Sequence, residues 1–313
     1  MTKAFVFPGQ GSQDVGMGRE LAEAFPVARQ VFEEVDDALG QGLRKLMLNG
    51  PEAELQLTEN TQPALMAMSV AVARVLMSEG NFKLGDKIRC VAGHSLGEYS
   101  ALTVADAFSL GDAARILKAR GRAMQEAVPV GRGAMAALLG AEVEQAEEIA
   151  RDAAQGEICA AANDNAPGQI VLSGDASAVD RALALAADRG LKRAIKLAVS
   201  APFHCALMQP AADKMAEVLA ATKIGYPSVP LIANVTAASV SDPDDIRKLL
   251  VEQVTSRVRW RECVLRMKAD GIDTLVEVGA GKVLTGLTKR IDKELTGMNV
   301  STPADVEAFL KTI

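Results

Sequence analysis

Short apolar runs alternate along this chain with longer segments in which apolar residues recur at helical spacing. The runs KAFVFPG at the N-terminus, IRCVAG from residue 88 and TLVEVG from residue 274 are continuous enough to predict buried strands. Between the first two lies PALMAMSVAVARVLMSEG, which predicts a helix that begins at Pro63 and ends at Gly80. A strand followed by helices and another strand is typical of an α/β protein.

The pattern changes between residues 131 and 199. This stretch predicts, in order, a strand (GAMAALLG), a helix (AEVEQAEEIARDAA), two strands (EICAAANDNAPGQIVLSG), a helix (DASAVDRALALAADRG) and a strand (LKRAIKLAV). That order is the ferredoxin-like split βαβ pattern. The α/β pattern then returns with VPLIANV and the helix DPDDIRKLLVEQV. We therefore predict a ferredoxin-like subdomain at residues 131–199, inserted into a discontinuous large α/β domain of residues 1–130 and 200–313.

Charge and cysteine content exclude several classes of protein. The 313 residues carry a formal net charge of -6, which argues against a general nucleic-acid binder because phosphate-backbone affinity comes from clustered Lys and Arg. The four cysteines form no C-x-x-C pair, so we expect reduced thiols and a cytoplasmic location. No apolar run reaches membrane-spanning length, and the N-terminal one is too short for a signal peptide.

Two glycine-rich segments look like nucleotide-binding loops and lack a required residue. For EVGAGKVLTGL to form a phosphate loop, the motif would need Gly at Val276, the residue just before this segment, and Ser or Thr at Val283. In GQGSQDVG, Asp14 stands where the third glycine of a dinucleotide fingerprint belongs. We interpret both as tight turns and predict no nucleotide cofactor.

The segment CVAGHSLGEYSALT contains the pattern G-x-S-x-G at residues 93–97, between an apolar strand and a sequence compatible with a helix. That context suits a sharp turn that exposes the Ser95 hydroxyl, with backbone N–H groups at the helix start available to an oxyanion. A strand–helix junction that merely contains glycines is an equal alternative for the pentapeptide alone.

A serine nucleophile needs a base, which is usually histidine, and the chain has only two. His94 adjoins the serine, where the turn should point the two side chains apart. His204 lies in VSAPFHCALM, after a proline and ahead of a helix, a loop position from which an imidazole reaches a cleft. We favour His204 as the base over a histidine satisfied by backbone at a helix start.

Arg120 lies in the helix DAARILKARGRAMQEAV, on the apolar face of Ala113, Ile116 and Leu117. An arginine that points inward needs a partner, and its planar guanidinium suits a carboxylate. From the residues alone, a structural pair with a core acid such as Glu98 and a bound carboxylate remain the two alternatives.

Four segments together resemble the malonyl-CoA:acyl-carrier-protein transacylase family of bacterial fatty-acid synthesis. They are FPGQGSQ, GHSLGEYSAL, SAPFHCALM and EVGAGKVLTGLTKR, and they occur in the family's order and spacing over nearly the full chain. The resemblance implies an α/β fold, with an α/β-hydrolase-like core and an inserted ferredoxin-like subdomain. It also implies that a malonyl group passes from malonyl-CoA through a serine ester to the phosphopantetheine thiol of acyl carrier protein, with no metal or redox cofactor.

The resemblance further implies a role for each residue of the site. Ser95 is the nucleophile, His204 is its general base, and Arg120 holds the malonyl carboxylate. The backbone N–H groups of Gln10 and Leu96 form the oxyanion hole, and the backbone carbonyl of Gln253 orients the histidine.

Three alternatives share some of these features. An esterase or thioesterase has the same serine turn but presents a late acid and a histidine near the C-terminus. A catalytically silent carrier-binding subunit would keep the fold, and a polyketide-synthase acyltransferase domain has similar motifs. An acidic carrier would dock on local positive charge, for which the candidates are Lys192, Arg193, Lys196, Lys282, Lys289 and Arg290. The alternative is that these residues are ordinary solvated faces.

Overall fold

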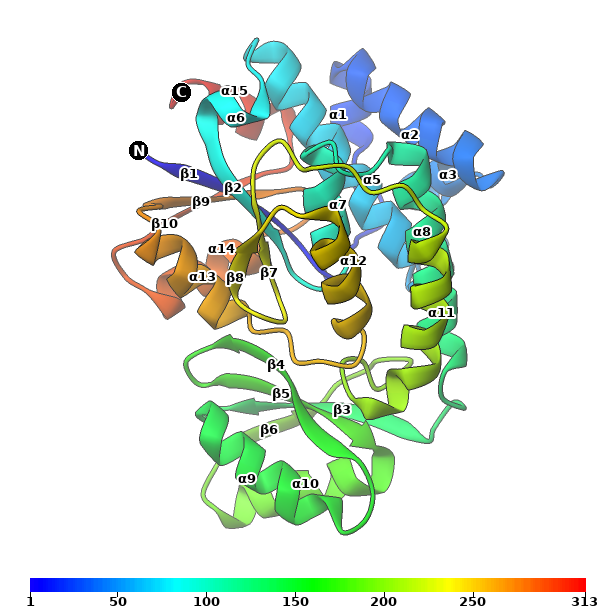
Figure 1. The fold of residues 1–313 in the computed structure, drawn as a ribbon, viewed down its shortest axis with the longest axis vertical. Helices are drawn as coiled ribbons and strands as arrows, with labels where there is room; N and C mark the ends of the chain where they lie inside the picture. The colour runs from blue at the N-terminus through cyan, green and yellow to red at the C-terminus, as the bar shows by residue number, and fades with distance from the viewer.

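Six strands form the larger of two sheets, in the order β10-β9-β1-β2-β7-β8 (Figure 1). All neighbouring pairs are parallel except the last, in which β8 runs antiparallel to β7. The computed structural model describes residues 1–313. The strands are β1 (Lys3–Phe7), β2 (Ile88–Gly93), β7 (Leu231–Ala233), β8 (Ala238–Val240), β9 (Thr274–Val278) and β10 (Thr296–Val300).

Helices cover both faces of this sheet, which explains why every residue of β1 and β9, and all but one residue of β2, is buried. Along β1, Phe5 and Phe7 enter one core while Ala4 and Val6 enter the other, since alternate residues face opposite sides. The first core includes residues of α5 (Thr58–Glu79), α7 (Gly97–Val104) and α8 (Leu110–Glu126), and the second includes residues of α13 (Trp260–Ala269) and α14 (Val283–Ile291). The remaining helices are α1 (Arg19–Ala24), α2 (Pro26–Leu39), α3 (Leu43–Asn49), α4 (Glu52–Leu55), α6 (Leu84–Lys87), α11 (Gln209–Ala220), α12 (Pro243–Glu252) and α15 (Pro303–Leu310), with a 3-10 turn at Ala206–Met208.

The second sheet has four antiparallel strands in the order β4-β5-β3-β6. Its elements are β3 (Gly133–Leu139), α9 (Val143–Ala154), β4 (Cys159–Ala166), β5 (Gln169–Asp175), α10 (Ala176–Asp188) and β6 (Arg193–Lys196). The two helices lie on the side of the sheet away from the large sheet, at the bottom of Figure 1. The predicted ferredoxin-like order of elements is confirmed, while the division at residues 131 and 199 stays a prediction.

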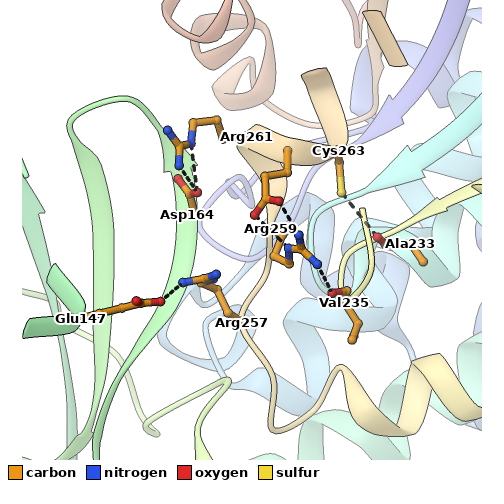
Figure 2. Close-up of polar contacts among 9 residues, drawn as sticks. Glu147, Asp164, Ala233, Val235, Arg257, Arg259, Arg261 and Cys263 are labelled. Carbon is orange, nitrogen blue, oxygen red and sulfur yellow. Dashed lines mark hydrogen bonds and ion pairs between the residues drawn. The ribbon is translucent and has the colours of Figure 1, made fainter. Parts of the chain in front are cut away.

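A short backbone pairing joins β4 to the segment between α12 and α13. The Val258 N–H donates to the Ala162 carbonyl at 2.9 Å, and the Asp164 N–H donates to the Val258 carbonyl at 2.9 Å. Figure 2 shows the ion pairs on either side, in which Arg257 meets Glu147 and Arg261 meets Asp164. These contacts hold the end of β4 against the large α/β unit.

The sequence prediction of the long helix was wrong at its start. Helix α5 begins at Thr58, so Pro63 lies inside it. The preceding turn is helical because its side chains are buried and bonded: Thr58 and Thr61 are fully buried, and the Thr61 hydroxyl donates to the Leu55 carbonyl at 2.6 Å. The edge strands β8 and β10 were also absent from the sequence prediction. None of the helices is both long enough and apolar enough to cross a membrane.

Candidate active site

The turn between β2 and α7 places Ser95 at the mouth of a cavity, in a left-handed backbone conformation with φ of 53°. Only glycine fits two positions before and two positions after Ser95, at Gly93 and Gly97. A Cβ on Gly93 would lie 1.9 Å from the carbonyl carbon of Gly97, and a Cβ on Gly97 would lie 2.3 Å from the Phe7 carbonyl oxygen. The two glycines therefore let strand and helix approach closely enough to force the sharp turn.

Ser95 and His204 are hydrogen-bonded although 109 positions separate them. The His204 Nδ1–H donates to the Gln253 backbone carbonyl at 2.9 Å. Because a carbonyl only accepts, Nε2 is left as an acceptor, and the Ser95 Oγ–H donates to it at 2.8 Å. The Gln253 carbonyl thus occupies the place of the carboxylate in a serine–histidine–acid triad.

Burial keeps His204 neutral. The residue is 4% exposed, and desolvation together with the positive charge of Arg120 lowers the pKa of the imidazole to about 3. A neutral imidazole at pH 7 has the free electron pair that a general base needs.

Arg120 is 1% exposed and reaches the serine from α8. Its Nη1 donates to Gln62 Oε1 at 2.9 Å, and its Nη2 donates to Ser95 Oγ at 3.1 Å and to Gln253 Oε1 at 2.8 Å. None of these acceptors is a carboxylate, so the guanidinium carries a buried charge with no anionic partner in contact.

The alternative of a structural pair between Arg120 and Glu98 is not formed. Glu98, which is 1% exposed, instead receives the Asn234 backbone N–H and the Gln253 side-chain Nε2. Burial raises the pKa of the Glu98 carboxyl to about 8, while these two hydrogen bonds and the Arg120 charge act to lower it.

A cavity of about 630 Å³ opens in front of the serine. Gln10 and Leu96 line it on one side, and Asn163 and Asn165 of β4 line it from the small subdomain. His94 also lines it, but its Nε2–H donates to Asn165 Oδ1 at 2.9 Å, so its imidazole is engaged away from the Ser95 hydroxyl. The volume suits a small acyl group and part of a larger donor.

Comparison with known proteins places the chain in a family. The family model described as "Acyl transferase domain" matches residues 4–304. The malonyl CoA-acyl carrier protein transacylase of Escherichia coli strain K12 is 46% identical over 308 residues, 98% of each chain. The chain belongs to the malonyl-CoA:acyl-carrier-protein transacylase family.

Solved structures agree with this assignment. The crystal structure of an acyl-carrier-protein-S-malonyltransferase from Bartonella henselae has a TM-score of 0.97 and 54% identity, covering 100% of this chain and 99% of that one. A malonyl-transacylase in complex with a type II PKS acyl-carrier protein has a TM-score of 0.97 and 46% identity, covering all of both chains. The α/β fold and its small subdomain, expected from the sequence, are confirmed by these matches.

The structure brings all six residues of the expected site to one region. Ser95, His204, Arg120 and the Gln253 carbonyl are joined by hydrogen bonds, whereas Gln10 and Leu96 line the same cavity without a hydrogen bond to the other four. Their roles stay predictions.

Sequence reasoning missed one residue that holds the serine turn, Asn234, and the part that the Gln253 side chain plays there. Asn234 Oδ1 accepts the Ser95 backbone N–H at 2.8 Å, and Asn234 Nδ2 donates to the Gly93 carbonyl at 2.7 Å. The Gln253 side chain donates through Nε2 to the Ser95 carbonyl at 3.0 Å, whereas the resemblance concerned only the Gln253 backbone carbonyl. The available signal was weak: Asn234 is a polar residue near the end of the apolar run VPLIANV, and polar side chains where a strand gives way to a loop are candidates for a site. No group of three or more His, Cys, Asp or Glu side chains is arranged to hold a metal ion.

Proposed function

We propose that this protein transfers a malonyl group from malonyl-CoA to the phosphopantetheine thiol of acyl carrier protein, by way of a malonyl ester on Ser95. The observation that carries the proposal is the buried guanidinium of Arg120, whose Nη2 lies 3.1 Å from Ser95 Oγ and which contacts no carboxylate of the protein. A buried cation without a counter-ion favours a ligand that supplies one. A malonyl thioester carries its free carboxylate beside the carbonyl that the serine attacks.

In the first half-reaction, Ser95 Oγ attacks the thioester carbonyl while neutral His204 takes the hydroxyl proton through Nε2. The backbone N–H groups of Gln10 and Leu96 receive the oxyanion of the tetrahedral intermediate. The carbon–sulfur bond then breaks, and His204 gives its proton to the departing CoA thiolate. The Gln253 carbonyl accepts the Nδ1–H throughout and so keeps the imidazole in the tautomer and orientation that the reaction needs.

In the second half-reaction, the carrier's thiol loses its proton to His204 and its sulfur attacks the serine ester. The carbon–oxygen bond to Ser95 breaks, and the serine recovers the proton from His204. The enzyme returns to its starting state, with no metal or redox cofactor in the scheme. In this proposal residues 1–130 and 200–313 form the catalytic unit, and residues 131–199 form the inserted one.

The carrier partner is supported by the names of the relatives, one of which was solved with an acyl-carrier protein. The six basic residues considered for docking are exposed, although two of them have partners: Lys196 pairs with Asp180 at 2.6 Å, and Arg290 donates to Gln169 at 2.6 Å. Strand β6, which carries Arg193 and Lys196, leads directly into Leu197, a residue of the cavity wall. We propose that positive charge at this mouth steers an acidic carrier.

We also propose that the protein works in the cytoplasm. All four cysteines are free thiols, and three of them are buried. Free cysteines are typical of proteins in a reducing compartment.

The decisive experiment is to mix the protein with malonyl-CoA, quench with acid and measure its mass. A malonyl adduct on the Ser95 peptide, absent from Ser95→Ala, and its transfer to added holo acyl carrier protein are the expected results. Release of free malonate without an adduct would instead identify a thioesterase. Ser95→Ala should unfold at nearly the same temperature as the unaltered protein, since the hydroxyl lies at a cavity mouth and fills little space.

A further inference from the structure

Glu98 is the centre of a buried hydrogen-bond network beneath the active site. It lies in the first turn of α7, three residues after Ser95, and is 1% exposed. One carboxylate oxygen accepts the Asn234 backbone N–H, and the other accepts Gln253 Nε2 at 2.5 Å. Both partners donate, so both oxygens act as acceptors, as they do in the ionised carboxylate that Glu98 becomes above its raised pKa of about 8.

The two partners of Glu98 hold the serine from both sides. Asn234 Oδ1 accepts the Ser95 N–H at 2.8 Å, and Gln253 Nε2 donates to the Ser95 carbonyl at 3.0 Å. Ser95 has a positive φ, a conformation that a non-glycine residue keeps only when its surroundings enforce it. Glu98 therefore acts on the nucleophile through two residues without touching its side chain.

The same carboxylate sets the orientation of the Gln253 amide. With Nε2 bonded to Glu98 and Ser95, the amide presents Oε1 to Arg120, which donates to it at 2.8 Å. The opposite orientation would set Oε1 against two oxygens and the NH₂ group against the guanidinium. Each of those contacts would place two acceptors or two donors against each other. The carboxylate at position 98 therefore selects the amide orientation in which Oε1 accepts from Arg120.

We propose that Glu98 is a positioning residue for the choice of acyl group, which fixes the Gln253 amide and through it the Arg120 guanidinium that receives the malonyl carboxylate. The inference rests on the proposed malonyl transfer. It assigns to Glu98 an effect on selectivity and not only on folding, because the chain of contacts ends at Arg120 beside the serine hydroxyl.

The test is Glu98→Gln. The assay is run at a pH above 8, because burial raises the pKa of the Glu98 carboxyl to about 8 and the unaltered side chain is ionised only above that value. The new amide keeps the size of the side chain, and its oxygen accepts the Asn234 N–H, which leaves its NH₂ facing Gln253. Gln253 is then expected to turn its oxygen toward position 98 and its NH₂ toward Arg120, which displaces the guanidinium. The ratio of acylation kcat/KM for malonyl-CoA to that for acetyl-CoA should fall by about tenfold or more, the factor expected for a lost hydrogen bond to a charged group.

Glu277→Gln is the matched control. Glu277 is a fully buried carboxylate on β9 that accepts the Leu284 N–H at 3.1 Å and the Thr285 N–H at 2.7 Å, and it does not line the cavity. Its loss should lower stability without changing the malonyl-to-acetyl ratio. A change in the ratio of equal size in both variants would overturn the proposal, as would an unchanged ratio in Glu98→Gln.

If Glu98→Gln gives no soluble protein, the same ratio is measured with Glu98→Asp. The shorter side chain keeps the charge but cannot reach both Asn234 and Gln253, so the ratio should again fall, and a ratio equal to that of the unaltered protein would refute the inference. Failure of the proposed function is seen separately, as the absence of any malonyl adduct on the unaltered protein.

Discussion

Replacing Arg120 with alanine tests the substrate assignment most directly. The change removes a guanidinium that is 1% exposed and leaves a neutral space beside the Ser95 hydroxyl. A malonyl carboxylate bound there would lose its counter-ion, whereas an acetyl group has no charge to lose. We therefore expect a large loss with malonyl-CoA, and acetyl transfer that holds steady or rises.

The magnitude follows from the burial of the charge. Removing one member of a buried, hydrogen-bonded charge pair costs about 3–5 kcal/mol. The cavity opens to solvent, so the lower end applies, and about 3 kcal/mol corresponds to a roughly hundredfold loss in kcat/KM at 1.4 kcal/mol per factor of ten.

The assay is the rate of Ser95 acylation with each CoA thioester, measured by rapid quench and mass. Arg122→Ala is the control, because Arg122 lies on the same helix with its side chain 60% exposed and pairs with Glu59 at the surface. That variant should keep the ratio of the two rates. An unchanged ratio in Arg120→Ala would show that Arg120 is structural and that selectivity lies elsewhere.

Three further results are expected. The acylation rate should not fall as the pH is lowered through 6.5, because His204 stays neutral until its depressed pKa of about 3. The stability that the neutral, buried His204 contributes should be complete above pH 6.5 and be lost progressively as the pH falls from there toward 3, because the unfolded chain takes up the proton first. Urea unfolding at a series of pH values measures that loss. Raising the salt concentration should slow transfer to the carrier more than acylation by malonyl-CoA, and equal responses would count against a basic docking surface. Arg261→Ala should lower the free energy of unfolding by about 3 kcal/mol in urea, because it leaves the Asp164 carboxylate, whose side chain is 1% exposed, without its ion-pair partner. Arg266→Ala, which removes an exposed ion pair with Asp270, should change that free energy by less than about 0.5 kcal/mol.

The order of the elements was readable from the sequence because it depends on local pattern. The run IRCVAG matches β2 residue for residue, and the strand–helix order of residues 131–199 matches the four-stranded sheet and its helices. Apolar runs and helical spacing report burial over a few residues, whatever the rest of the chain does. The short edge strands β8 and β10 were missed for the same reason, since most of their residues are exposed or only partly buried.

The serine turn was likewise predictable, and the network around it was not. Glycines at 93 and 97 flank the serine within five residues, so the turn has a local signature. The resemblance to a family indicated His204, Arg120 and the Gln253 carbonyl by position, without their geometry.

Only the tertiary structure decided how Glu98 is used. The sequence offered it as an ion-pair partner of Arg120, and the fold instead bonds it to Asn234 and Gln253, which lie 136 and 155 positions away. Contacts between residues so far apart in the sequence depend on which strands are neighbours in the sheet, and here β2 lies beside β7. The local spacing of apolar residues carries no information about that strand order. The sequence by itself thus determined the elements and the nucleophile's turn, while the packing of distant strand ends determined which polar groups hold that turn in place.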